Sequence, residues 1–169
     1  MPPSTKNLIF LFQYLKLISV ILILFSSNIS AENKIISSYF GSIKWNKANV
    51  RTGPGQQYPI EWEFHKKNLP VEIINKYGSW LKIRYLDEDV GWVHQRLIST
   101  SRFVMINGST QIIRDKPNNL SKAILIAEDK VIASLLSCNK KWCKINIKQK
   151  NGWILKQYLW GVYQSEILD

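Results

Sequence analysis

Hydrophobic and polar residues alternate with a period of two along much of the chain. Two stretches show this best, "LPVEIINKY" (residues 69–77) and "WLKIRYL" (residues 80–86), and both favour β-branched and aromatic types. Turn-forming groups such as "KYGS" and "LDED" recur at intervals of about 8 to 12 residues. The pattern predicts an all-β fold of short strands, a small barrel or sandwich, with no helix after the N-terminal segment.

The same unit occurs twice in the chain. Three matches stay in register at offsets of 63, 62 and 61 residues: "VRTGPG" with "IRDKPN", "SWLKIRY" with "KWCKINI", and "VGWVHQRLI" with "NGWILKQYL". A single unit of roughly 60 residues buries only about 60% of the surface of its unfolded chain. We therefore expect two small domains that pack against each other.

Residues 1–31 have the features of an export signal. Lys6 supplies a positive start, "LISVILILF" is an apolar run, and "SSNISA" offers the small residues that precede cleavage after Ala31. The competing interpretation is an uncleaved membrane anchor. A membrane span needs about 20 mostly apolar residues, and Gln13 and Lys16 interrupt the only candidate. We expect cleavage, no stable membrane span in the mature chain, and a periplasmic or secreted protein.

The chain is basic, with a formal net charge of +11. Removing the signal takes away two lysines and no acid, so about nine positive charges remain. Such a charge suggests nucleic acid in a cytosolic protein, but an exported protein meets anionic cell-wall polymers and lipid headgroups. High charge also keeps proteins soluble. We expect no nucleic-acid partner.

The two cysteines, Cys138 and Cys143, lie in the exported part, where thiols usually pair. The intervening "NKKW" contains turn-forming residues, so the cysteines would face each other across a hairpin at a separation that suits a disulfide. A zinc site needs histidines at ligand spacing, and His65 and His94 lie far upstream. The sequence predicts a structural disulfide, with no metal and no cofactor.

The stretch "NVRTGPGQQYP" contains a tight turn. Gly53 and Gly55 permit positive φ and Pro54 fixes its own φ, so the segment is expected to redirect a strand into a long loop. A phosphate cradle needs a helix after the turn, and "QQYPIEWEF" has no helical pattern.

These segments resemble the bacterial SH3-like (SH3b) family. The motif "NVRTGPGQQYP", the "WLKIR" strand and "GWVH" match its entry, central and closing strands, and the second copy is a diverged repeat without the entry glycines. The arrangement is similar to the exported tandem SH3-like proteins of alphaproteobacteria. The resemblance implies two tandem SH3-like β-barrels after the signal peptide. The expected segments are a lead-in (32–43), a first domain (44–99), a second domain (103–163) and a C-terminal tail (164–169).

Four tryptophans occupy equivalent positions in the two copies: Trp80, Trp92, Trp142 and Trp153. Repeated aromatic residues are usually core residues. We expect Trp92 and Trp153 to close the ends of their domains from inside.

The resemblance implies a non-catalytic binding module of the cell envelope, which recognises cell-wall peptide (peptidoglycan) or an envelope protein. The alternative is a structural or adaptor protein with rigidly packed barrels and a protein partner only. No catalytic constellation can be built from two histidines and a paired cysteine, so we expect no enzyme. The candidate ligand groove comprises aromatic residues of the first copy and one cation: Tyr58, Trp62, Tyr77, Trp80 and Arg51.

Overall fold

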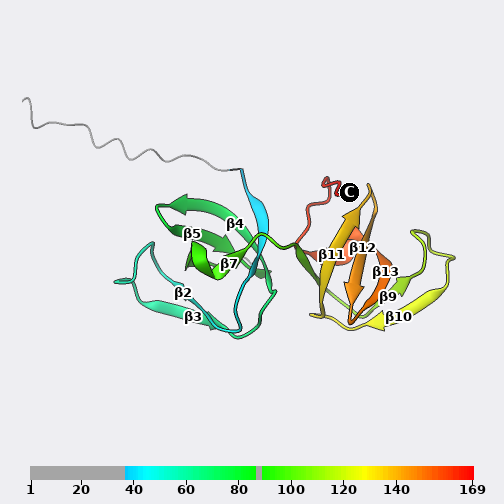
Figure 1. Cartoon of the computed structure of the whole chain (residues 1–169), viewed down its shortest axis with the longest axis horizontal. Helices are drawn as coiled ribbons and strands as arrows, with labels where there is room; N and C mark the ends of the chain where they lie inside the picture. The colour runs from blue at the N-terminus through cyan, green and yellow to red at the C-terminus, as the bar shows by residue number, and fades with distance from the viewer. Residues whose placement is uncertain (1–36, 87–88) are drawn as a thin grey trace, which may run out of the picture. The chain divides into compact units, whose positions relative to one another are not determined.

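The computed structural model describes residues 37–86 and 89–169, which form two antiparallel sheets of seven strands each (Figure 1). The first sheet contains β1 (Tyr39–Ile43), β2 (Ala48–Arg51), β3 (Ile60–Phe64), β4 (Pro70–Tyr77), β5 (Trp80–Arg84), β6 (Val90–His94) and β7 (Ile98–Ser99). The second contains β8 (Phe103–Ile106), β9 (Gln111–Arg114), β10 (Ala123–Ala127), β11 (Ile132–Cys138), β12 (Trp142–Ile147), β13 (Lys150–Leu155) and β14 (Leu159–Trp160). Single 3-10 turns, η2 (Gln95–Leu97) and η3 (Lys156–Tyr158), precede β7 and β14. Over these ranges there is no α-helix, in line with the predicted all-β fold.

The two sheets share one topology. The strand order is β3-β2-β6-β5-β4-β1-β7 in the first and β10-β9-β13-β12-β11-β8-β14 in the second. Each strand of the second sheet therefore occupies the place of the strand seven positions earlier. The duplication inferred from three sequence matches extends to every strand, and we call the two halves the first and second repeats.

Period-two alternation sorts the side chains of each strand between a core and an outer face. In β5, Leu81 and Ile83 are buried, whereas Trp80 and Lys82 are only partly covered. Fully buried aliphatic side chains of this kind each contribute roughly 1.5–3 kcal/mol. Equivalent buried positions in the two repeats include Ile43 and Ile106, Val50 and Ile113, Val71 and Ala133, Ile83 and Ile145, and Val93 and Ile154.

The same alternation corrects the expectation for Trp92 and Trp153. Both are half-buried and neither belongs to the buried core, because their strand neighbours Val93 and Ile154 take the inward positions. Trp92 pairs with Lys82 on one side and Arg51 on the other. Trp153 pairs likewise with Lys144 and Arg114. Each repeat thus carries a Lys–Trp–Arg row across its outer face.

The hairpin that follows the fourth strand is closed differently in the two repeats. Between β4 and β5 the chain turns through Gly78, which has φ +53°. Between β11 and β12, Cys138 and Cys143 are direct cross-strand partners, 4.1 Å apart at Cα, and form a disulfide. The predicted disulfide is confirmed, and it spans the positions that Lys76 and Leu81 hold in the first repeat.

The reason for the two glycines of the "GPG" turn differs from the expected one. Positive φ among glycines is confined to other positions within the described residues, so Gly53 and Gly55 do not need it. At Gly53, close approach excludes a side chain instead, because a Cβ would lie 2.6 Å from Cγ of Tyr58. At Gly55 a Cβ would meet only the end of the flexible Gln57 side chain, which can move aside.

Two segments that were expected to flank the domains pair with the sheets. β1 was expected in a lead-in ahead of the first domain, but it pairs with both β4 and β7 and lies inside the first sheet. The tail of residues 164–169 is attached to the second sheet, because Leu168 exchanges two backbone hydrogen bonds with Cys138. The expected signal segment, residues 1–31, lies outside the described residues.

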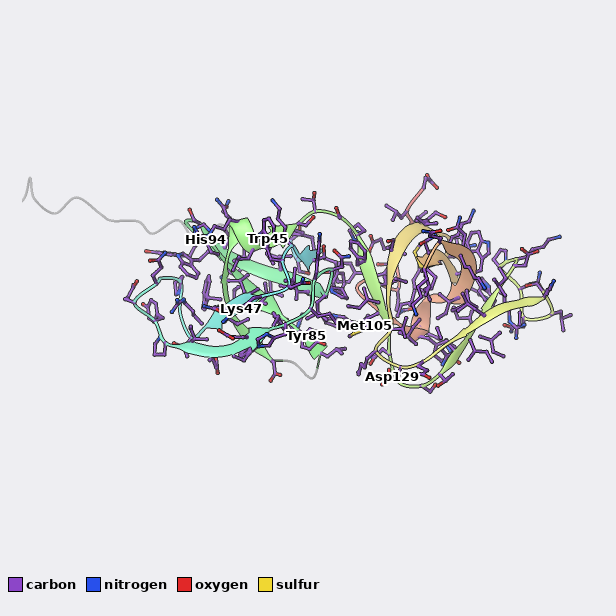
Figure 2. The ribbon with its side chains drawn as sticks, turned by 60° about the horizontal axis from the view of Figure 1, so that its bottom comes forward. Trp45, Lys47, Tyr85, His94, Met105 and Asp129 are labelled. Atoms are coloured by element: carbon purple, nitrogen blue, oxygen red, sulfur yellow. A yellow bond between two sulfur atoms is a disulfide. The ribbon has the colours of Figure 1, made fainter. Side chains whose placement is uncertain are left out.

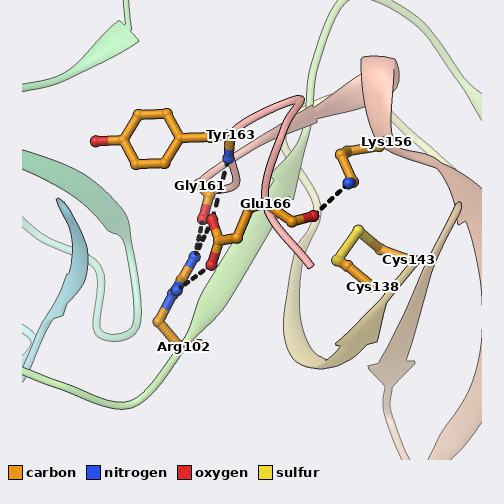
Figure 3. A network of polar contacts seen from close by, with 7 residues as sticks. All are labelled: Arg102, Cys138, Cys143, Lys156, Gly161, Tyr163 and Glu166. Carbon is orange, nitrogen blue, oxygen red and sulfur yellow. Dashed lines mark hydrogen bonds and ion pairs between the residues drawn. A yellow bond between two sulfur atoms is a disulfide. The ribbon is translucent and has the colours of Figure 1, made fainter. Parts of the chain in front are cut away.

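A polar network holds the C-terminal segment (Figure 3). Arg102 donates two hydrogen bonds to the Glu166 carboxylate, at 2.6 and 3.2 Å, and a third to the carbonyl of Gly161. The buried ammonium of Lys156 donates to the backbone carbonyls of Gln164 and Glu166. Burial alone would raise the pKa of Glu166, but hydrogen bonds from Arg102 and the Tyr163 N–H, with the Arg102 and Lys156 charges, hold it below its usual value.

The two repeats contact each other through the C-terminal end of the second. The Trp160 indole N–H donates to the Pro70 carbonyl at 3.1 Å, and its ring meets Phe40 edge to face. The Tyr163 hydroxyl donates to the buried Glu72 at 2.8 Å. Burial and the neighbouring Glu72 raise the pKa of Tyr163, against a smaller lowering by the hydrogen bond with Ser38.

Candidate functional site

A groove opens on the first repeat where β2, β5, β6 and η2 meet the loop after β2. Its volume is about 320 Å³. We call it the first groove, and it is lined by Lys47, Asn49, Arg51, Gln56, Trp80, His94, Arg96 and Leu97. These residues come from segments far apart in the sequence, which the strand order β2-β6-β5 brings together.

Trp80 and His94 form the aromatic wall of the first groove. They are direct cross-strand partners, and their rings meet edge to face with centroids 5.4 Å apart. Nδ1 of His94 accepts a hydrogen bond from the Arg96 N–H at 3.2 Å, which begins η2. The ring proton of neutral His94 is therefore on Nε2, where it remains a donor.

Arg51 fixes the loop that forms one rim. Its guanidinium donates to the carbonyl of Tyr58 at 2.6 Å, across the loop. Arg114 does the same in the second repeat, donating to the Ser121 carbonyl at 2.9 Å. Because the bond recurs at the same spacing in both repeats, it is a structural feature of the fold. It also leaves Arg51 less free than the other cations of the groove.

The first groove is cationic. Lys47, Arg51 and Arg96 bring three permanent positive charges, and none of the lining residues is acidic. Lys47 pairs with Glu63 at 3.1 Å, outside the groove lining. Arg96 is exposed and is the second of the three residues of η2. Such a surface attracts carboxylates, and a planar guanidinium binds them in a bidentate manner.

The second repeat has a groove at the equivalent place, with a volume of about 330 Å³. Arg114 and Trp142 stand where Arg51 and Trp80 stand in the first repeat. Thr110 replaces Lys47, and Leu155 replaces His94. The lining of the second groove therefore carries one positive charge, on Arg114, whereas the lining of the first carries three.

The structure brings together two of the five residues predicted to line a ligand groove, Arg51 and Trp80. Tyr58 is 39% exposed and its ring covers Gly53 within its own loop. Trp62 packs against the core of the first repeat. Tyr77 is the cross-strand partner of Trp80, is 59% exposed, and is outside the lining.

Sequence reasoning missed the charged and polar part of the groove. This part comes from β2 and its flanking segments, the end of β6, and η2, and comprises Lys47, Asn49, Gln56, His94 and Arg96. A comparison of the two copies could have indicated the basic residues of the groove. His94 and Arg96 align with Leu155 and Gln157, so the first copy carries two basic side chains where the second has none.

Across residues 37–86 and 89–169, no three His, Cys, Asp or Glu side chains gather where they could hold a metal ion. In the same ranges, no helix has the length and hydropathy needed to cross a membrane.

Comparison with known proteins gives one family and several distant relatives. A family model described as the bacterial SH3 domain matches residues 44–100 and again residues 107–161, together more than half of the chain. A protein of Bacillus subtilis named as an N-acetylmuramoyl-L-alanine amidase, YrvJ, is 26% identical over 156 residues, 86% of this chain and 29% of that protein. The chain thus spans less than a third of the length of this relative.

Two solved structures are similar at low identity. NlpC1 from Trichomonas vaginalis is 14% identical, covering 79% of this chain and 49% of its own, with a TM-score of 0.35. An NlpC/P60 family protein from Bacillus cereus is 15% identical, covering 71% of this chain and 55% of its own, with a TM-score of 0.32.

Proposed function

Because the chain belongs to the bacterial SH3 domain family, we propose that it is a non-catalytic binding module of the cell envelope, which recognises cell-wall peptide through the first groove. The observation that carries this proposal is the cationic lining beside the Trp80–His94 wall. The peptide stems of peptidoglycan are short and end in carboxylates. A guanidinium and an ammonium at one end of an aromatic wall suit such a ligand.

The relative from Bacillus subtilis supports a cell-wall ligand but not an activity. Its name refers to the amide bond between an N-acetylmuramoyl group and L-alanine. Only 29% of that protein is matched, and the matched family model describes an SH3 domain. Amidase activity is therefore not carried over to this chain.

The cellular setting belongs to the same proposal. Residues 1–31 would direct export to the periplasm or the outside of the cell. The disulfide between Cys138 and Cys143 supports an oxidising compartment. The two domains, proposed at residues 44–99 and 103–163 with β1 added to the first, would each close as a small barrel.

A second candidate is an adaptor whose ligand is an envelope protein. The contacts of Trp160 and Tyr163 with the first repeat favour it, because they join the two repeats into one compact unit. In that case cell-wall material would not compete for the first groove.

Co-sedimentation with purified peptidoglycan sacculi separates the two candidates. Arg96→Gln removes one exposed charge from the first groove, and Lys116→Gln removes one exposed charge from the second repeat as a matched control. We expect the Arg96 variant to sediment about fivefold less than wild type and the control to sediment normally, since a hydrogen bond to a charged group contributes about 1–2 kcal/mol at a partly exposed site. Equal sedimentation of both variants, or none by wild type, would refute the peptide groove.

A further inference from the structure

Trp45 is the most exposed of the seven tryptophans, all of which lie in the described part of the chain. Its side chain is 53% exposed, in the short loop between β1 and β2 (Figure 2). The others are half-buried or buried. An exposed indole offers a large, flat and rigid apolar surface, with an N–H donor at its edge, that a ligand can cover.

The fold does not need this tryptophan. In the second repeat the equivalent loop follows β8, because Ile106 bonds to Val131 as Ile43 bonds to Leu69. The position of Trp45 is taken there by Gly108, whose N–H donates to the Asp129 carboxylate. The same loop thus forms with no side chain at this position.

A hollow of about 420 Å³ lies beside the ring. Its polar lining comes from Asn68, Ser99 and Ser101, and two ammonium groups, Lys44 and Lys67, stand with them. The Lys44 Nζ lies 5.4 Å from the centroid of the Trp45 ring, and Phe103 completes the lining. No carboxylate belongs to this lining.

This hollow adjoins the first groove along the chain. Trp45 is two residues before Lys47, which lines the first groove, and the Lys44 N–H donates to the carbonyl of Leu97, another lining residue. The loop of residues 44–47 therefore separates the two sites. A ligand with two chemically different parts can occupy both.

We propose that the Trp45 hollow is a carbohydrate subsite that stacks one pyranose ring of a cell-wall glycan on the indole. The C–H face of a pyranose is flat and weakly apolar and matches an indole face. Hydroxyl and acetamido groups at its edge suit the amide and hydroxyls of Asn68, Ser99 and Ser101. The inference rests on the proposed function, since it adds the sugar part of the ligand whose peptide part would lie in the first groove.

The experiment uses two probes with the full mature chain: glycan strands freed of their stem peptides by amidase digestion, and stem peptides alone. Isothermal titration compares wild type with Trp45→Ala and with Leu120→Ala. Leu120 is 98% exposed in the second repeat and serves as the matched control for removing a surface apolar side chain. Near-ultraviolet circular dichroism checks folding of each variant.

We expect free glycan strands to bind wild type and Leu120→Ala equally, and Trp45→Ala about tenfold more weakly. Stem-peptide binding should be the same in all three proteins. Glycan strands that do not bind wild type, or that bind Trp45→Ala as well, would overturn the subsite. Loss of binding to anionic phospholipid vesicles in Trp45→Ala, without glycan binding by wild type, would overturn it too and make the loop a membrane contact. If glycan strands bind as expected and stem peptides do not bind wild type, the result would contradict the peptide groove and support the carbohydrate subsite.

Discussion

Replacing Glu166 by glutamine tests how the C-terminal segment is held on the second repeat. The carboxylate accepts both hydrogen bonds from Arg102 and a further one from the Tyr163 N–H at 3.2 Å. Glutamine keeps one oxygen acceptor, but its amide group turns a donor toward the second guanidinium N–H. The Arg102 guanidinium, whose buried Nε has no hydrogen-bond partner among the described residues, then also lacks the negative charge that balances it.

The magnitude follows from the partial burial of the pair. The side chain of Glu166 is 18% exposed and that of Arg102 is 24% exposed. Exposed ion pairs contribute at most about 1 kcal/mol, and breaking a fully buried one costs about 3–5 kcal/mol. We expect the free energy of unfolding to fall by about 2 kcal/mol near pH 7, or roughly 6 °C in Tm for a chain of this size.

The loss depends on pH with a definite sign. The folded pKa of Glu166 lies below its ordinary value of 4.5. The stabilisation is therefore complete above the unfolded pKa and disappears as the pH falls through the folded pKa. The difference between wild type and variant should shrink steadily below about pH 4.5 and approach zero once the wild-type carboxyl is protonated.

Urea unfolding with the disulfide intact, at about pH 7 and about pH 3, measures this difference. Glu128→Gln makes the same chemical change at an exposed site of the second repeat and should alter stability by less than about 0.5 kcal/mol. A Glu166→Gln penalty of the same size at both pH values would show that the ion pair is not its source. An unchanged free energy of unfolding at about pH 7 would show that the Arg102–Glu166 ion pair does not stabilise the fold.

Two other predictions concern the turns. Serine at both Cys138 and Cys143 should lower the free energy of unfolding by about 2 kcal/mol, measured by urea titration, because the disulfide closes a small ring in the unfolded chain; wild-type stability would contradict this. Gly53→Ala should cost about 1 kcal/mol through its clash with the Tyr58 ring and much less in a Tyr58→Ala background, a coupling that a double-mutant cycle measures. If Gly53→Ala costs the same free energy of unfolding in wild type and in Tyr58→Ala, the Tyr58 ring is not the group with which it clashes.

The duplicated all-β architecture was predictable because its signals are local. Alternation in "WLKIRYL" already assigns Leu81 and Ile83 to one face, and the three offset matches fix the repeat. The disulfide was predictable for the same reason, since Cys138 and Cys143 are separated only by their own hairpin turn.

The groove was harder to predict because it depends on pairing between strands distant in sequence. Trp80 lines the groove, but its neighbours His94 and Arg96 follow from the register of β5 against β6 and from the cap of η2. Aromatic type alone did not separate the groove from the core. Trp62 turns inward onto the first core, whereas Trp92, predicted to be internal, lies on the outer face between two cations.

The glycines of the turn show a second limit. Sequence can indicate that Gly53 is favoured but not whether backbone conformation or close approach requires it. Here the ring of Tyr58 excludes a Cβ, and Tyr58 is itself tied by its carbonyl to Arg51. Two residues predicted to bind ligand thus maintain the loop.

The most direct test of the central claim is a ¹H–¹⁵N correlation titration of residues 32–169 with a free peptidoglycan stem tetrapeptide. The two grooves supply an internal control, since the indole N–H signals of Trp80 and Trp142 report on equivalent sites. If the first groove binds the peptide, the Trp80 indole and the His94 and Arg96 amides shift in a saturable manner while the Trp142 indole stays in place. Saturable shifts confined to other surfaces, equal shifts of both indoles, or no shift at all would contradict the account.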